Sequence, residues 1–229
     1  MKLSGAATPE GTARYQKRFA DKIPAEHFHQ ALGLSLSSIG IGTYLGNHDD
    51  ATDEQYRQAI IRAVESGCNV VDTAINYRCQ RSERAIGAEL KELAARGFSR
   101  NEVVIASKAG FLPFDGAPPQ DARSYFEQTF VAGGIAAATE IIGGYHCMAP
   151  RYLTQQLDCS LDNLDVECID IYYVHNPESQ LGKIPREEFD LRLCRAFEAL
   201  EQAVAAGKIR TYGTATWNGY RNPAEAPDY

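Results

Sequence analysis

Four residues of different chemical type stand at or just after stretches that read as strands. Asp72 and Tyr77 follow a short apolar run in NVVDTAINY, Lys108 ends VVIASK, and His175 ends CIDIYYVH. Short apolar runs of this kind are typical of buried strands. A carboxylate in such a run is costly to bury unless a cation pairs with it. We therefore expect Lys108 to pair with Asp72, and all four groups to meet at one end of a sheet.

These four groups are the types that carbonyl reduction beside a hydride donor requires. A proton must reach the carbonyl oxygen as the hydride reaches the carbon, and a phenol with a pKa of about 10 is a reluctant acid at neutral pH. The Lys108 ammonium is expected to lower the pKa of Tyr77, while Asp72 keeps that ammonium charged and oriented. His175 can hydrogen-bond the carbonyl oxygen or take part in proton transfer.

Each residue also has a purely structural interpretation. Asp72 and Lys108 could form an ion pair inside a barrel, Tyr77 could pack at the start of a helix, and His175 could be a satisfied histidine at a strand end. Structural ion pairs and core histidines are common. The occurrence of all four residues on three successive strand ends favours a function.

Strands and helices alternate along the chain. Strands are expected over 35–44, 68–73, 102–107, 168–174 and 208–216, with helices over 53–66, 82–96, 151–164 and 187–206, the first of these capped by Thr52 or Asp53. This order predicts an α/β fold, a parallel sheet with right-handed crossovers, in which active groups collect at the carboxyl ends of the strands.

Two segments fall outside this alternation. Residues 1–33 read as an N-terminal extension with a short helix near 12–19. Residues 110–150 are rich in Gly, Pro and aromatic residues and are too long for an ordinary connection, so we expect an excursion with local helix that forms one wall of a pocket. Within it, His146 is expected to have a loop or capping role.

The end of the first expected strand, SLSSIGIGTY, contains two glycines. Glycine in a strand often marks close approach of a ligand or of another backbone. The segment Gly42, Thr43 and Tyr44 is therefore a candidate ligand contact, with tight packing at the strand end as the alternative. The GxGxxG pattern that opens a helix in dinucleotide-binding folds is absent.

The composition excludes several classes of partner. The chain has 229 residues and a net charge of −7, with no basic patch for nucleic acid. No run reaches about 18 apolar residues, so no membrane span is expected. The N-terminus lacks the apolar core of a signal peptide, and six cysteines without CxxC spacing are expected to be buried thiols, which together predict a cytoplasmic location. The histidine pairs lack further ligands at metal spacing, so no metal is expected.

The segments VVDTAINY, SKAG and YYVHNP resemble the aldo-keto reductase family, as do the Leu-rich helix before IDIYYVH and the later GKIRTYGTAT. The resemblance runs from about residue 34 to residue 217. It implies a (β/α)8 TIM barrel of which about five β/α units are present, over residues 34–229. It also implies NADPH as hydride donor and aldehydes or ketones as small-molecule substrates.

The resemblance implies a role for each site residue. Tyr77 would be the general acid, Lys108 and Asp72 would tune it, and His175 would orient the substrate. Contacts to NADPH would come from Gly42, Thr43, Tyr44, Asp72 and Thr216.

The sequence departs from the family pattern at three places. It stops after five strands, whereas the last three strands of the family carry the stacking aromatic and the loop that grips the 2′-phosphate. The Ser-Asn pair after the fifth strand is replaced by Ala215 and Thr216, and the excursion at 110–150 is longer than usual. Five strands leave two open edges, which invite self-association. The chain is accordingly expected to be a segment of a longer protein, a unit completed by a partner, or a remnant.

Three hypotheses follow from the sequence. The first is an NADPH-dependent carbonyl reductase. The second is a non-catalytic relative that binds nucleotide as a sensor or regulatory subunit, or a remnant without the cofactor phosphate site. The third, a metal-dependent barrel hydrolase using Asp72, Lys108 and His175, lacks the His pair that such enzymes carry on the first strand.

Overall fold

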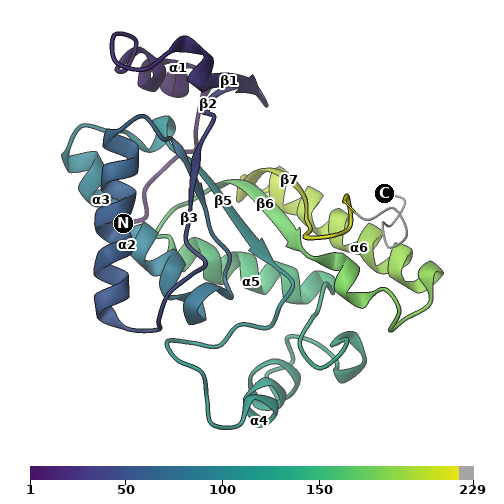
Figure 1. Ribbon diagram of the computed structural model, residues 1–229. Helices are drawn as coiled ribbons and strands as arrows, with labels where there is room; N and C mark the ends of the chain where they lie inside the picture. The colour runs from purple at the N-terminus through teal and green to yellow at the C-terminus, as the bar shows by residue number, and fades with distance from the viewer. Residues whose placement is uncertain (222–229) are drawn as a thin grey trace.

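The computed structural model describes residues 1–221 and contains a five-stranded parallel sheet whose strands lie side by side in chain order (Figure 1). The strands are β3 (Gly40–Gly42), β4 (Val70–Asp72), β5 (Val104–Ala109), β6 (Ile169–His175) and β7 (Ile209–Ala215). The helices between them are α2 (Asp50–Glu65), α3 (Arg81–Ala95), α5 (Pro150–Asn163) and α6 (Arg186–Ala205). The predicted parallel sheet with helical crossovers is confirmed.

The helices pack because each has one apolar face. On α5, Leu153, Leu157 and Leu161 are buried four residues apart, and on α6 Phe189 and Leu193 repeat the same spacing. Such a stripe covers the apolar outer face of the sheet. This packing fixes the orientation of the strands and therefore the positions of the residues at their carboxyl ends.

The start of α2 corrects the predicted helix cap. The N-cap is Asp49, whose carboxylate Oδ1 accepts a hydrogen bond from the backbone N–H of Thr52 at 2.8 Å. An Asp before the first turn satisfies backbone donors that have no partner within the helix. The sequence analysis placed the cap at Thr52 or Asp53, one turn too late. The Asp53 carboxylate instead accepts a hydrogen bond from Arg78.

The first predicted strand, 35–44, is two strands in the structure. Residues 34–37 form β2 (Leu34–Ser37), which pairs antiparallel with β1 (Phe28–Ala31), and only β3 joins the parallel sheet. The Asn69 side chain accepts a hydrogen bond from the backbone N–H of Ser37, and the Ser37 hydroxyl accepts one from the N–H of Asn69. These contacts end the hairpin and separate β2 from β3.

The N-terminal helix also differs from its prediction. It is α1 (Pro9–Lys17) rather than a helix near 12–19, because the Thr8 hydroxyl caps it by accepting from the N–H of Gly11 at 2.9 Å and Pro9 suits the first turn. The Tyr15 hydroxyl donates to the carbonyl of Val64 at 2.5 Å. Helix α1 and the β1–β2 hairpin cover the end of the sheet where the strands begin (Figure 1).

The boundary between an extension and a barrel at residues 33 and 34 stays a prediction, and the β1–β2 hairpin spans it.

A buried acid at the same end ties three segments together. The Asp170 carboxylate, 2% exposed, accepts hydrogen bonds from the backbone N–H groups of Ala7 at 2.6 Å and Ile105 at 2.8 Å, and from the Arg100 guanidinium at 2.8 Å. Buried charges are tolerated when they are paired and fully hydrogen-bonded. Asp170 therefore joins the N-terminal segment to β5 and β6.

The excursion at 110–150 contains the local helix that the sequence predicts. Helix α4 (Ala122–Phe126) runs into a π-helical turn, Glu127–Ala132. The two ends of the excursion pair, since the N–H of Leu112 donates to the carbonyl of Tyr145 and the N–H of Cys147 donates to that of Gly110. The excursion thus leaves and returns beside the end of β5.

Among residues 1–221, no helix combines the length and the apolar character needed to cross a bilayer.

Candidate active site

Three of the four predicted residues meet at the end of β4 and β5. The Lys108 ammonium donates to Asp72 Oδ1 at 2.6 Å and to the carbonyl of Thr73 at 2.7 Å, and its Nζ lies 3.5 Å from the Tyr77 hydroxyl. Lys108 is 6% exposed. The convergence of amine, acid and phenol predicted from the sequence is therefore present in the structure.

The strand register explains this convergence. Asp72 is the last residue of β4 and stands opposite Gly42 on one side and Ala106 on the other. Lys108 lies two residues further along β5, opposite Tyr173 of β6. Because residues two apart on a strand face the same side, Asp72 and Lys108 extend into the same region at the carboxyl end of the sheet.

His175 completes the group from the end of β6. Its ring lies edge-on to Tyr77, with centroids 5.7 Å apart, and edge-on to Phe111, with centroids 5.0 Å apart. The imidazole is buried, and its Nδ1 has no hydrogen-bond partner among the described residues. The fourth predicted residue thus packs against Tyr77.

A left-handed turn directly after Tyr77 fixes where the phenol points. Arg78, Cys79 and Gln80 have φ values of 48°, 56° and 69° in succession, and non-glycine residues in this region are strained. The buried Arg78 guanidinium donates to Asp53 Oδ1 at 2.6 Å and to a loop carbonyl, that of Asn47, at 2.8 Å. These bonds to α2 and its preceding loop hold the turn in place.

The pKa of Tyr77 corrects one prediction. The sequence analysis expected the Lys108 ammonium to lower it, whereas burial, together with the negative charge of Asp72, raises the pKa of Tyr77 to about 12. Asp72 offsets the charge of the ammonium, which lies closer to the carboxylate than to the phenol. Burial also lowers the pKa of Lys108 below its usual range, against the opposing effect of Asp72. Tyr77 is therefore a protonated phenol at neutral pH.

The imidazole of His175 is neutral at the same pH. Burial, with a smaller effect from the Lys108 ammonium, lowers its pKa to about 3. A neutral imidazole keeps one N–H donor and one acceptor nitrogen.

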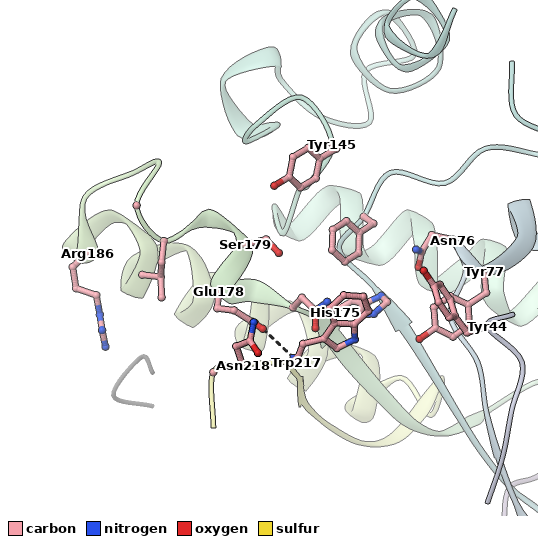
Figure 2. A pocket seen from close by; sticks show the side chains of 15 residues that line it. Tyr44, Asn76, Tyr77, Tyr145, His175, Glu178, Ser179, Arg186, Trp217 and Asn218 are labelled. Atoms are coloured by element: carbon pink, nitrogen blue, oxygen red, sulfur yellow. Dashed lines mark hydrogen bonds between the residues drawn. The ribbon is translucent and has the colours of Figure 1, made fainter. Parts of the chain in front are cut away.

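Two of the four residues, Tyr77 and His175, line a cavity of about 980 Å³, and Lys108 and Asp72 lie behind Tyr77. Figure 2 shows Tyr44, Tyr77 and His175 grouped at one part of it, with Arg186 far from them. The cavity is lined by residues from every strand end and from the excursion, namely Tyr44, Asn76, Tyr77, Phe111, Tyr145, His175, Asn176, Glu178, Ser179, Leu181, Gly182, Arg186, Trp217, Asn218 and Gly219. The prediction that the excursion forms one wall is confirmed by Phe111 and Tyr145.

A sequence model of the aldo/keto reductase family matches residues 38–222. The chain belongs to this family. Among curated relatives, aldo-keto reductase yakc, named for NADP(+), from Schizosaccharomyces pombe is 28% identical over 182 residues, which are 78% of this chain and 42% of that protein. The chain therefore spans less than half the length of this relative.

Solved aldo-keto reductases share the fold. Aldo-keto reductase AKR11C1 from Bacillus halodurans, in its holo form, matches with a TM-score of 0.57 and 23% identity over 82% of this chain and 50% of that one. An aldo-keto reductase from Klebsiella pneumoniae in complex with NADPH matches with a TM-score of 0.51 and 21% identity, covering 84% and 52%. The predicted fold class, an incomplete (β/α)8 barrel of about five units, is thereby confirmed.

Of the residues predicted to contact a cofactor, some line the cavity and others do not. Tyr44 lines the cavity and packs edge-on against Tyr77, with ring centroids 4.9 Å apart. Gly42, Thr43, Asp72 and Thr216 are not among the cavity-lining residues. The Thr43 hydroxyl donates to the carbonyl of Asp72, and the Thr216 hydroxyl accepts from the N–H of Gly219 at 2.5 Å. Their contact with a cofactor stays a prediction.

Polar residues that the sequence analysis did not single out also line the cavity. Glu178 accepts from the N–H of Trp217 at 3.1 Å (Figure 2), and its other carboxylate oxygen has no partner among the described residues. The buried Oδ1 of Asn176 likewise has none among them. The sequence pattern assigned a role to His175 and none to Asn176, the next residue. The position of Asn176 on the cavity is the observation that identifies it as a candidate.

Within residues 1–221, no group of three or more histidine, cysteine or acidic side chains is arranged to hold a metal ion.

Proposed function

We propose that this protein is an NADPH-dependent oxidoreductase that reduces aldehydes or ketones to alcohols. The observation that supports this most strongly is the placement of the Lys108 ammonium, 2.6 Å from Asp72 and 3.5 Å from the Tyr77 hydroxyl. Tyr77 itself lines a large cavity together with His175. The family to which the chain belongs, and relatives whose names include NADP(+) or NADPH, support the same reaction.

In this proposal Tyr77 is the general acid. Its pKa of about 12 keeps the phenol protonated at neutral pH, so it can donate a proton to the oxygen of a carbonyl being reduced. Negative charge then develops on the phenol oxygen, where the Lys108 ammonium stabilises it. The attraction strengthens as the charge develops, so it favours the transition state over the ground state. Asp72 keeps the ammonium charged and oriented.

His175 orients the substrate in this proposal. It is neutral at physiological pH and it lines the cavity next to Tyr77, so its imidazole can hydrogen-bond the carbonyl oxygen there.

The cavity fits the nicotinamide end of NADPH. A nicotinamide presents a flat ring and an amide, and the cavity is lined by the aromatic rings of Tyr44 and Trp217 and by the carboxamide residue Asn176. When bound, NADPH supplies the hydride. The cavity volume of about 980 Å³ is at the upper end for ligand pockets.

For the phosphates, the lining residues within 1–221 provide one cation, Arg186, which is also bonded to Asp190. We therefore assign only the nicotinamide end to named residues.

The rate of carbonyl reduction should be independent of pH from about pH 5 to pH 8, because the phenol of Tyr77 and the imidazole of His175 titrate outside this range. As pH rises further, the rate should fall with loss of the Lys108 proton, whose pKa burial lowers. Steady-state kcat/KM measured across pH tests this, and Lys108→Arg should move the alkaline fall to higher pH. A group titrating near pH 6.5 would contradict a neutral His175.

The second candidate is a non-catalytic relative that binds nucleotide. This candidate is supported by the extent of the match, because the chain covers less than half of the yakc sequence. Measuring NADPH affinity and aldehyde-dependent NADPH consumption on the same preparation separates the two. We expect one alcohol formed per NADPH consumed, whereas tight NADPH binding without alcohol would favour a sensor or regulatory role.

The outer strands β3 and β7 each have one side without a strand neighbour among residues 1–221. Self-association through these edges stays a proposal that light scattering at two protein concentrations can test. A cytoplasmic location also stays a prediction.

A further inference from the structure

His146, in the returning end of the 110–150 excursion, is completely buried against the site. Its Nε2 lies 2.8 Å from the main-chain carbonyl oxygen of His175, and its Nδ1 lies 2.9 Å from the side-chain nitrogen of Gln180. Gln180, in the turn after β6, is also completely buried. One imidazole therefore connects the excursion, the end of β6 and the turn that follows it.

The partners of the ring fix which nitrogen carries the proton. The amide nitrogen of Gln180 can only donate, so Nδ1 of His146 accepts. The proton then resides on Nε2, which donates to the carbonyl of His175. Both nitrogens are thus satisfied, and burial lowers the pKa of His146 to about 4, which keeps the ring neutral.

The local backbone is built to admit this ring. Phe111 and His146 form an antiparallel bridge, which places the His146 side chain next to the end of β6. A Cβ atom on Gly110 would lie 2.6 Å from the carbonyl oxygen of His175 and 2.8 Å from Nε2 of His146. Only a glycine at this position allows the two groups to approach each other as they do.

The carbonyl of His175 lies one residue beyond the last pair of the β5–β6 ladder, Ala109 and Val174. A buried carbonyl needs a donor, and His146 provides it in place of the next strand residue. The His175 imidazole has no side-chain hydrogen bond of its own at Nδ1 among the described residues. Its orientation therefore depends on the main chain to which it is attached and on ring contacts with Tyr77 and Phe111.

We propose that His146 is a positioning residue that holds His175 in its place at the cavity through the hydrogen bond to the His175 carbonyl. It is not among the cavity-lining residues, and it acts through His175. The proposal deepens the proposed carbonyl reduction, on which only its kinetic test depends.

His146→Phe keeps a ring of similar size and removes both hydrogen bonds, whereas His146→Gln keeps an amide donor that can reach the same carbonyl. Tyr152→Phe is the matched control, because the buried Tyr152 hydroxyl donates to the carbonyl of Phe111 at 2.8 Å without contacting His175. Gln180→Met is a second variant should His146→Phe fail to fold. It removes the donor that keeps the His146 proton on Nε2, and so weakens the bond from Nε2 to the His175 carbonyl.

The direct test is the nitrogen NMR spectrum of the imidazoles in 15N-labelled protein. His146→Phe and Gln180→Met should shift or broaden the ring signals of His175, while His146→Gln and Tyr152→Phe should leave them close to those of the wild type. Unchanged His175 signals in the folded His146→Phe protein, or in Gln180→Met if only that variant folds, would overturn the proposal. This measurement decides the role of His146 even if the wild type reduces no carbonyl, an outcome that would contradict the proposed function alone.

The kinetic test is a double-mutant cycle. His146→Phe should lower kcat about tenfold with little change in KM, and it should lower kcat less than about twofold when His175 is already Ala. An equal loss in both backgrounds would show a general structural effect and would contradict positioning through His175.

Discussion

Replacing Tyr77 with phenylalanine should lower kcat/KM for aldehyde reduction by about 10²- to 10⁴-fold, the range that general acid catalysis contributes. The phenol is the group placed to give a proton to a carbonyl oxygen, since its pKa of about 12 keeps it protonated. Removing the hydroxyl should leave the fold intact, because its polar contact is with Lys108 at 3.5 Å and the ring keeps its packing against Tyr44 and His175.

The matched control is Tyr212→Phe, which removes a hydroxyl bonded to Glu201 on the exposed surface. This variant should turn over aldehyde like the wild type. NADPH affinity should be retained in both variants, so that a loss in Tyr77→Phe is assigned to proton transfer. A Tyr77→Phe protein as active as Tyr212→Phe would show that Tyr77 is not the acid.

Replacing Asp170 with alanine should lower the free energy of unfolding by about 3–5 kcal/mol, the cost of breaking a buried ion pair. The change leaves the buried Arg100 guanidinium without its counter-ion and removes the acceptor for the N–H groups of Ala7 and Ile105. Urea unfolding followed by circular dichroism measures this loss as a lower midpoint.

Asp158→Ala is the control for that experiment. Asp158 also pairs with a cation, Lys208, but its side chain is half exposed, and exposed pairs contribute less than about 1 kcal/mol. Equal midpoints for Asp170→Ala and Asp158→Ala would contradict the role given to the buried acid in joining the N-terminal segment to the sheet.

The sequence was sufficient to predict the order of elements and the convergence at the site. Helix and strand periodicities are local properties of the chain, and parallel strands present their carboxyl ends at one edge, so Asp72, Lys108 and His175 could be placed together before any distance was known. The position of Tyr77 followed from its spacing after β4. The strained turn after Tyr77, which fixes the direction of its side chain, could not be predicted from the sequence because its three residues are not glycines.

Contacts between distant segments account for the errors. The division of the first strand depends on the Asn69 side chain, 32 residues after Ser37, and the start of α2 depends on which of several adjacent polar residues caps it. The pKa of Tyr77 rises rather than falls because burial and the distances to Lys108 and Asp72 decide its direction. Residue types alone do not contain that information.

His146 shows the same limit most clearly. Judged by ligand spacing, it had no function beyond a loop or a cap. Its actual partner is the main chain of a residue 29 positions later, brought next to it by the pairing of the two ends of the excursion. Periodic patterns in the sequence do not predict a contact of this kind between distant segments.

The most direct test of the proposed chemistry is to follow the transferred hydrogen. NADPH carrying deuterium at the transferable position of the nicotinamide would be incubated with the protein and an aromatic aldehyde, and the alcohol analysed by mass spectrometry. The proposal predicts one deuterium on the carbinol carbon of the alcohol formed by the wild type, and almost no alcohol with Tyr77→Phe. Labelled NADPH that binds tightly but yields no deuterated alcohol would contradict it.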